Sequence, residues 1–195
     1  MRIDYPEGAT PLDPDEAEGL RLTHITTREQ LNIFEAENIR RAAEQAFTAR
    51  ASDILGEVFI RRLHREMFKS VWKWAGEFRR TDKNIGDVPR ERIGTELRHL
   101  CDDVRFWIDH ATFEPDEIAA RFHHRLVFIH PFVNGNGRHA RLITDLLLEK
   151  MLRRPRFSWG GSKLESQGEV RDAYIRALRA ADRNDYAPLL DFVRS

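Results

Sequence analysis

Apolar residues recur at intervals of three and four along most of the chain, and this spacing predicts amphipathic helices. The first helix is expected after Thr26 and Thr27, because each is followed three residues later by Glu or Gln in a capping box. Further apolar stripes cover residues 52–76, 89–110, 114–129, 138–151, 170–181 and 186–193. The pattern therefore predicts an all-α fold, a helical bundle with only a small hairpin in the polar break at residues 77–90.

The length of 195 residues is sufficient for one domain with a buried core. Residues 1–22 hold three prolines among acidic residues and few apolar ones, so we predict an extended arm on the surface. The single domain is expected to occupy residues 23–195.

Charge and cysteine content indicate the setting of the protein. Thirty-two basic residues balance 32 acidic ones, so no bulk field favours nucleic acid or an anionic membrane as a partner. The start of the chain lacks the apolar core of a secretory signal, and no apolar run has the length of a membrane span. Cys101 is the sole cysteine and has apolar neighbours, so we expect a reduced, packed thiol in a cytoplasmic protein.

The stretch HPFVNGNGRHAR, from His130 to Arg141, contains polar residues that a packed core does not explain. It joins two apolar helices, and Gly135 and Gly137 allow the backbone to approach a ligand closely. A helix that begins just after Gly137 would direct its free N–H groups and positive dipole end to that place, which favours an anion. Arg138 and Arg141 would share a face of the helix and match phosphate oxygens. His130, at the end of the preceding helix, could accept a proton near neutral pH.

This stretch resembles the signature of the Fic (Fido) family, H-x-F-x-(D/E)-G-N-G-R-x-x-R, with one departure. The resemblance is specific at residues 130–141 and 74–86 and extends more loosely from about Thr27 to the C-terminus. The chain resembles small stand-alone members of the family, some of them labelled mobile mystery protein B. The resemblance implies a Fic-type helical bundle with a small β-hairpin flap. It also implies a protein adenylyltransferase, which moves AMP from ATP to a hydroxyl side chain of a target protein.

By resemblance, His130 would deprotonate the target hydroxyl, and Phe132 would anchor the loop in the core. The loop backbone would hold the phosphates of ATP, with two arginines on the outer phosphates. The nucleotide-binding residues would then be Gly135, Asn136, Gly137, Arg138 and Arg141.

The departure is Asn134, which stands where the family has Asp or Glu as the ligand of Mg²⁺. An amide oxygen can coordinate a metal but brings no negative charge to a hard divalent cation. Asn134 is therefore a weak candidate for a metal ligand. The enzyme could be slow, could hold Mg²⁺ mainly through the phosphates of ATP, or could have changed its chemistry.

Residues 74–79 read W-A-G-E-F-R, a pattern that precedes the target-docking flap in Fic enzymes. The segment that follows is polar, basic and ends at a glycine. By resemblance, Lys83, Asn84, Ile85 and Gly86 would form part of a β-hairpin that aligns a target peptide by backbone pairing.

Many Fic proteins carry an inhibitory helix with the pattern (S/T)-x-x-x-E-(G/N), whose glutamate pairs with the second arginine of the signature. Glu37 and Asn38 match the last two positions, but Ile33 stands where Ser or Thr is expected. Glu37 is thus the inhibitory candidate and is predicted to reach Arg141. Glu35 is the alternative, and a solvated glutamate on an amphipathic helix is the other interpretation.

Three further residues suggest ligand sites only at first sight. His123 lies two helical turns before His130, with His124 beside it, but a third metal ligand is not near in sequence. We therefore expect structural or solvated histidines. Trp159 is expected to be a core anchor rather than a wall beside a bound base.

Two other functions remain open. A Fic fold can direct attack to a different phosphate, so a kinase-like or de-adenylylating enzyme is one alternative. The other is a non-catalytic module that binds a nucleotide or a protein. The partners expected from the first interpretation are a nucleotide, an unidentified target protein and, in a toxin-like setting, an antitoxin or a self-inhibitory segment.

Overall fold

Helices make up most of the regular structure in the computed structural model, as the apolar pattern predicts. The structure describes residues 18–22, 27–50, 53–82, 88–161 and 168–195. Over these residues, strand pairing is limited to two isolated antiparallel bridges, Leu20 with Trp72 and Phe78 with Phe132. The all-α class is confirmed, whereas the hairpin is not seen, and the predicted flap residues 83–86 lie outside the described ranges.

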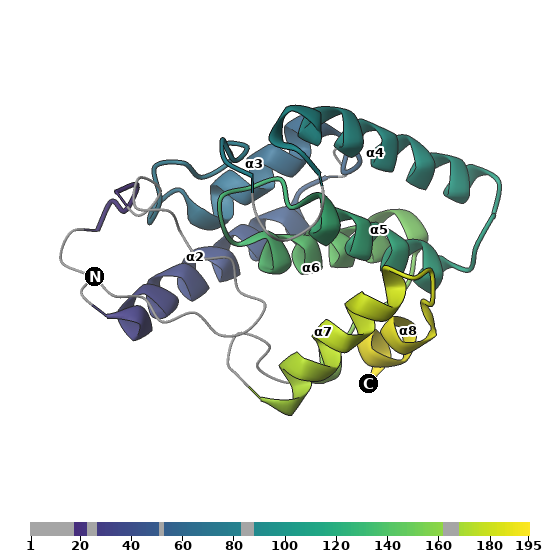
Figure 1. Ribbon diagram of the computed structural model, residues 1–195. Coiled ribbons are helices and arrows are strands. Elements are labelled where there is room, and N and C mark those ends of the chain that lie inside the picture. The colour runs from purple at the N-terminus through teal and green to yellow at the C-terminus, as the bar shows by residue number, and fades with distance from the viewer. Residues whose placement is uncertain (1–17, 23–26, 51–52, 83–87, 162–167) are drawn as a thin grey trace.

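The helices follow one another in the predicted order. Their bounds are α2 (Arg28–Thr48), α3 (Glu57–Phe68), η1 (Arg90–Arg92), α4 (Ile93–Asp109), α5 (Pro115–Ile129), α6 (Asn136–Leu147), the π-helical turn η2 (Leu148–Leu152), η3 (Trp159–Gly161), α7 (Glu169–Ala181) and α8 (Ala187–Arg194). In Figure 1, α5 and α6 run through the middle, with α3 and α4 above them and α7 and α8 below. None of the described helices is long and apolar enough to cross a lipid bilayer.

Two helix starts confirm signals read from the sequence. The Thr27 hydroxyl accepts the Gln30 backbone N–H at 3.2 Å, and the Gln30 side chain accepts the Thr27 N–H at 3.4 Å. This reciprocal capping box begins α2. Pro115 lies in the first turn of α5, where its missing N–H costs no hydrogen bond.

The helix predicted over residues 52–76 is shorter in the structure, because α3 ends at Phe68. The chain beyond it pairs with the end of the N-terminal arm instead of continuing the helix. Arg21 N–H donates to the Val71 carbonyl, and Lys73 N–H donates to the Gly19 carbonyl, each at 2.8 Å. Backbone pairing thus overrides the helical spacing of apolar residues, and it ties the described end of the arm to the bundle.

Two apolar clusters hold the bundle together. The larger joins α2, α3, α4, α5 and α6, and it includes the fully buried rings of Phe68, Phe122 and Phe132. The smaller packs α7, α8 and η3 against α5 and η2, around Tyr174 and Phe192. Burial of one such side chain contributes roughly 1.5–3 kcal/mol. Since Phe132 lies between α5 and α6, the larger cluster anchors that loop.

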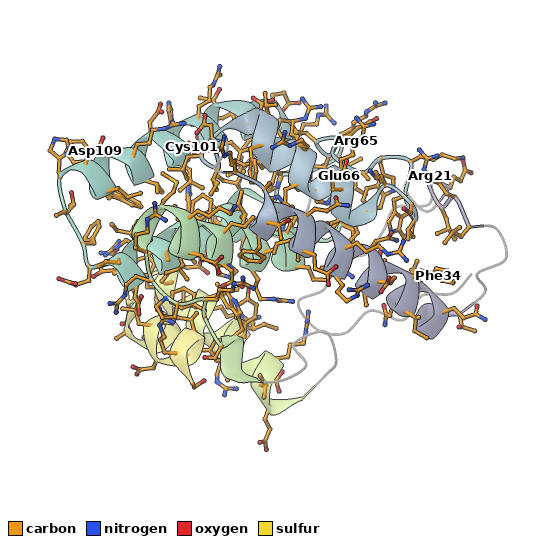
Figure 2. The ribbon with its side chains drawn as sticks, turned by 180° about the vertical axis from the view of Figure 1, so that it is seen from behind. Arg21, Phe34, Arg65, Glu66, Cys101 and Asp109 are labelled. Atoms are coloured by element: carbon orange, nitrogen blue, oxygen red, sulfur yellow. The ribbon has the colours of Figure 1, made fainter. Side chains whose placement is uncertain are left out.

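Cys101 lies on α4 and is buried in the larger cluster (Figure 2). Burial raises the pKa of its thiol to about 12, so the thiol stays protonated at neutral pH. The predicted packed thiol is confirmed.

Trp159 anchors the smaller cluster, as the sequence favoured, and its indole has a charged partner. The indole N–H donates to both carboxylate oxygens of Asp145, at 3.1 Å each, and the Phe157 N–H adds a bond at 3.2 Å. Burial raises the pKa of Asp145 to about 6, although these hydrogen bonds act in the opposite direction.

Replacing Asp145 by asparagine is expected to stabilise the protein at pH 8 and to change little at pH 4. The folded-state pKa of about 6 exceeds the ordinary value of 3.8. The folded protein therefore binds more protons in that window and loses stability as pH rises through it. Asparagine keeps an oxygen acceptor without the charge, so the expected gain at pH 8 is roughly 1–3 kcal/mol.

Urea unfolding of both proteins at pH 4 and pH 8 measures this difference. Asp109→Asn, at the exposed end of α4 (Figure 2), is the matched control, because it makes the same substitution at an exposed position. A loss of stability for Asp145→Asn at both pH values would mean that the hydrogen bonds of the carboxylate outweigh its burial.

Candidate active site

The loop between α5 and α6 holds two residues in the left-handed backbone region. His130 ends α5 with φ 51° and ψ 58°, and Gly135 precedes α6 with φ 76°. A histidine in this region costs on the order of 1–3 kcal/mol, which the surrounding structure must supply. The loop therefore turns sharply enough to place the end of α5 beside the start of α6.

Gly135 is required by space as well as by conformation. A Cβ at this position would lie 2.5 Å from Cζ of Phe68, whose ring is fully buried. The close approach predicted for this glycine thus occurs against α3 of the protein itself.

Gly137 differs, because a Cβ there would meet only Nη1 of Arg141, at 3.9 Å. The N-cap residue of α6 is Gly135, which has no side chain that could cap the first turn. The first turn of α6 consequently combines backbone donors, the positive end of the helix dipole and room for a ligand.

Asn136 has a structural task that its predicted role did not include. Its Oδ1 accepts the Phe132 N–H at 2.9 Å, and its Nδ2 donates to the Phe132 carbonyl at 2.8 Å. The buried amide thus closes the loop on itself, and the contact of Asn136 with phosphates stays a prediction.

Arg138 points to α2. Its Nη1 donates to Glu35 Oε2 at 2.7 Å, and its guanidinium lies 5.0 Å above the ring of Phe68. Glu35 is only 5% exposed, and its other oxygen accepts the indole N–H of Trp72 at 2.6 Å. One buried carboxylate therefore joins α2, the segment after α3 and the first turn of α6.

The prediction that Glu37 reaches Arg141 is wrong. Glu37 pairs with Arg40 at 3.0 Å and with Arg41 at 2.7 Å, both on its own helix, and these two arginines lower its pKa to about 2. On α2, the side chain of Glu37 faces solvent, whereas the side chain of Glu35 faces the signature loop. Glu35, the alternative read from the sequence, is the glutamate that meets a signature arginine.

Arg141 diverges from Arg138, although both lie on α6. Its Nη1 lies near Gly137, and its positive charge acts on the hydroxyl of Tyr174 on α7. Burial raises the pKa of Tyr174, and the charge of Arg141 opposes that shift. The two arginines thus relate the start of α6 to different elements, Arg138 to α2 and Arg141 to α7.

His130 is only 6% exposed, and its backbone carbonyl accepts a hydrogen bond from Arg79 Nε at 2.8 Å. The sequence pattern identifies Arg79 only as the last residue of the motif that precedes the flap. Its role could have been suspected, because an arginine beside the aromatic residue Phe78 needs acceptors if it is buried.

His64 is a second residue that the sequence did not single out. Its ring stacks on Phe132 at 3.8 Å between centroids and contacts Asn134 O through Nε2 at 3.0 Å. The Gly76 N–H donates to its Nδ1 at 3.0 Å. Burial holds the pKa of His64 well below 6.5, so the ring is neutral and joins α3 to the loop. Its place in the apolar stripe, beside Leu63 and before Met67, was the available signal.

The side chain of Asn134 is turned toward its own backbone. Its Oδ1 accepts the Gly135 N–H at 2.6 Å. Within the described ranges, no three His, Cys, Asp or Glu side chains gather in a way that could hold a metal ion. The residues at the loop therefore do not form a charged metal site of their own.

His123 and His124 are structural, as expected. His123 Nε2 bonds the Tyr174 hydroxyl at 2.8 Å, and burial lowers its pKa to about 3, so it is neutral at physiological pH. His124 Nε2 bonds Asp182 at 2.8 Å, and its Nδ1 bonds the Tyr186 hydroxyl at 3.2 Å. Both rings link α5 to the C-terminal helices.

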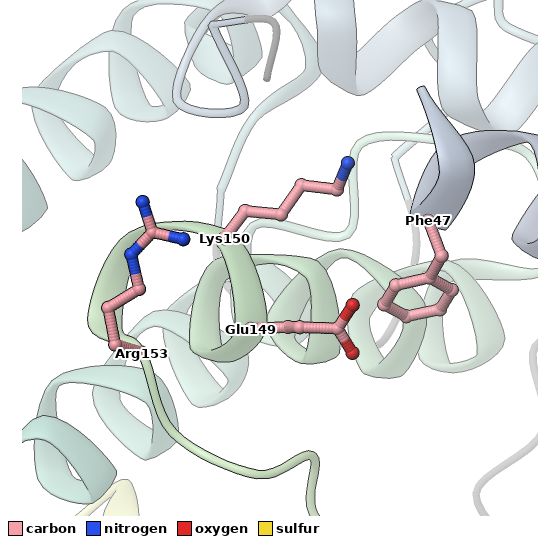
Figure 3. A pocket seen from close by; sticks show the side chains of 4 residues that line it. All are labelled: Phe47, Glu149, Lys150 and Arg153. Atoms are coloured by element: carbon pink, nitrogen blue, oxygen red, sulfur yellow. The ribbon is translucent and has the colours of Figure 1, made fainter. Parts of the chain in front are cut away.

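A shallow pocket of about 240 Å³ lies elsewhere, where the end of α2 meets η2 (Figure 3). Phe47, Glu149, Lys150 and Arg153 line it. Its charges are mixed and it contains no residue of the signature. We therefore assign the chemistry to the loop between α5 and α6.

Comparison with known proteins agrees with the signature. Residues 54–148 match the model of the Fic/DOC family. The chain is 31% identical over 121 residues to protein adenylyltransferase fic-1 of Caenorhabditis briggsae, covering 61% of this chain and 22% of that protein. It is 31% identical over 138 residues to protein adenylyltransferase Fic of Drosophila melanogaster, covering 69% of this chain and 26% of that protein. The chain thus spans about a quarter of the length of these curated relatives.

Solved structures share the fold. Fic-1 from C. elegans superposes with a TM-score of 0.65 at 25% identity, covering 91% of this chain and 51% of that one. BepC, a VirB-translocated effector of Bartonella tribocorum solved with bound AMPPNP, gives a TM-score of 0.67 at 16% identity over 87% of each chain. The signature at residues 130–141, the helical fold and the match over residues 54–148 together place this chain in the Fic/DOC family.

Proposed function

We propose that this protein is an adenylyltransferase that moves AMP from ATP to a hydroxyl side chain of a target protein. The observation that carries the proposal is the start of α6, where Gly137 leaves open space beside Arg141. Packing within the described residues does not demand a glycine there, whereas a triphosphate lying against the helix would. The relatives named protein adenylyltransferases and the ATP analogue held by BepC support the same function.

The proposed reaction uses the two helix ends that meet at the loop. The first-turn N–H groups of α6 and the two signature arginines bind the phosphates and stabilise the charge that develops on them. The target hydroxyl attacks the α-phosphorus, a new P–O bond forms, and the bond to the departing pyrophosphate breaks. The imidazole of His130 accepts the proton of the hydroxyl.

Mg²⁺ belongs to this proposal only as the counter-ion of the triphosphate. Asn134 offers a neutral oxygen that already accepts the Gly135 N–H, so residue 134 adds no negative charge for the ion.

The function is tested by incubating the protein with ATP and Mg²⁺, alone and in cell lysate, and measuring intact masses and label transfer. We expect a gain of one adenylyl group on the protein itself or on a lysate protein. A phosphate gain, or removal of AMP from an adenylylated protein, would indicate the kinase-like or de-adenylylating alternative. Nucleotide binding without any modification would indicate a non-catalytic module.

The contact between Glu35 and Arg138 favours self-inhibition as part of the proposed function. The carboxylate holds Arg138 at 2.7 Å, and Trp72 holds the carboxylate. Arg138 can bind an outer phosphate only after it leaves Glu35, so this pair competes with ATP. Glu35 replaces Glu37 as the inhibitory residue in this proposal.

Replacing Glu35 by glutamine is expected to raise the affinity for AMPPNP by about 5- to 30-fold, because roughly 1–2 kcal/mol of charge-assisted hydrogen bonding no longer competes. Glutamine keeps an acceptor for the indole of Trp72, so the fold should persist. Isothermal titration measures the affinity. Glu37→Gln is the matched control, since Glu37 pairs with Arg40 and Arg41 of its own helix, α2. Unchanged affinity together with a lower melting temperature for Glu35→Gln would make the pair purely structural.

Three finer points complete the proposal. Residues 83–86 are proposed to dock the target peptide, and an antitoxin is proposed as a second regulator beside the internal glutamate. A cytoplasmic location is proposed because ATP and protein targets are available there. We retain residues 23–195 as one domain preceded by an arm.

A further inference from the structure

Arg79 is a buried cation whose contacts are mostly backbone carbonyls. The residue is 3% exposed, and its Nη1 donates to the Thr81 carbonyl at 2.9 Å while Nη2 donates to the Val88 carbonyl at 2.5 Å. Thr81 and Val88 border residues 83–87 on either side. One guanidinium therefore holds both chain segments that flank this stretch.

The same guanidinium holds the end of α5. Its Nε donates to the His130 carbonyl at 2.8 Å, and Nη2 lies 3.5 Å from the Ile129 carbonyl. These carbonyls belong to the last turn of α5, where the helix dipole places negative charge. Arg79 thus satisfies acceptors that the helix itself leaves open, next to the residue with φ 51°.

Charge pairing does not explain the position of Arg79. Asp82 is the carboxylate it contacts, at 3.3 Å, and that side chain is 66% exposed. Burial lowers the pKa of Arg79, and Asp82 opposes this shift only in part. A buried cation is costly unless its donors are used, and here each guanidinium nitrogen has an acceptor.

We propose that Arg79 is a positioning residue for the transfer reaction, which fixes the backbone of His130 and couples it to the segments around Thr81 and Val88. The proposal rests on the proposed function. The backbone of Arg79 supports it, because its N–H donates to the Pro131 carbonyl at 2.9 Å and the neighbouring Phe78 bridges Phe132. Lysine cannot replace the fork, because its ammonium directs all its donors from a single atom.

The nucleotide-binding half of the loop is held by other contacts. Asn136 closes on Phe132, and the His139 N–H donates to the Gly135 carbonyl at 2.9 Å. Loss of the Arg79 fork should therefore displace His130 while the start of α6 keeps its geometry. A substitution of Arg79 should therefore impair proton transfer and leave nucleotide binding unchanged.

The test compares Arg79→Lys with the wild-type protein in two measurements. Steady-state AMP transfer should show kcat lowered by about 10²-fold, the usual cost of a misplaced catalytic group, with KM for ATP within about twofold. Amide hydrogen exchange by NMR should accelerate by about 10-fold or more at the N–H groups of Arg79 and His130. The N–H of His139, in α6, should exchange as in wild type.

Arg194→Lys is the matched control, because Arg194 also binds two carbonyls, of Pro155 and Arg156, and one carboxylate, of Asp116. It should leave kcat unchanged. If Arg79→Lys does not fold, Asp82→Ala provides a milder test, since it removes an exposed acceptor of Arg79 and should lower kcat about 2- to 5-fold without changing KM for ATP.

If the amide hydrogens of residues 79 and 130 exchange at wild-type rates in Arg79→Lys, the inference is overturned. It is also overturned if turnover and ATP binding fall equally while exchange becomes faster throughout the protein. If the wild-type protein transfers no AMP, the proposed function fails, while the exchange experiment still decides whether Arg79 fixes the backbone of His130.

Discussion

Replacing His130 by alanine is expected to lower the rate of AMP transfer by about 10²–10⁴-fold, the range attributed to a positioned general base. The affinity for AMPPNP should stay within a few-fold, because the phosphates are proposed to lie against α6 and its arginines. The target hydroxyl would then have to lose its proton to water, which is a far weaker base. Label transfer from ATP measures the rate, and isothermal titration measures the affinity.

His130→Asn is the control that separates chemistry from backbone strain. Asparagine tolerates the left-handed region well, so the φ of 51° costs it little, yet its amide does not accept a proton near neutral pH. Both variants should lose transfer alike. If His130→Asn retains the wild-type rate, the imidazole is not the base and the proposed mechanism is wrong.

Replacing Asn134 by aspartate is expected to lower the Mg²⁺ concentration for half-maximal transfer by about 10- to 100-fold, since one added carboxylate near the ion is worth on the order of 1.5–3 kcal/mol. Aspartate keeps an oxygen for the Gly135 N–H, and His64 still contacts the carbonyl of residue 134, so the loop should keep its shape. The measurement is the transfer rate as a function of Mg²⁺ at fixed ATP.

Asn184→Asp adds the same charge in an exposed turn after α7 and serves as the control. It should leave the Mg²⁺ dependence unchanged. The same dependence in Asn134→Asp would place the ion away from residue 134 and remove this position from the proposed site.

Much of the fold follows from local signals in the sequence. The capping box at Thr27 and the proline at the start of α5 mark helix ends that the structure confirms. The end of α3 at Phe68 could not be read in this way. There, Val71 and Lys73 pair through their backbones with Arg21 and Gly19. Neither Gly19 nor Arg21 has a sequence pattern that predicts a pairing partner so distant in the chain.

The candidate site was predictable in its parts but not in its contacts. The signature identifies residues 130–141, whereas the pairing of Glu35 with Arg138 joins residues more than a hundred positions apart. The helical period held a usable signal, because Glu35 lies four residues after buried Leu31 and so shares its inward face. Glu37, chosen by its resemblance to a motif, lies on the outward face.

The proximity of Tyr174 to Arg141 bears on how small a working fragment of this protein can be. The family match ends at residue 148, yet Tyr174, whose pKa is influenced by the charge of Arg141, lies on α7. A truncated version that stops after η2 would keep all the signature residues and lose a side chain close to its last arginine. Anyone who trims this protein for engineering should therefore carry the C-terminal pair of helices along.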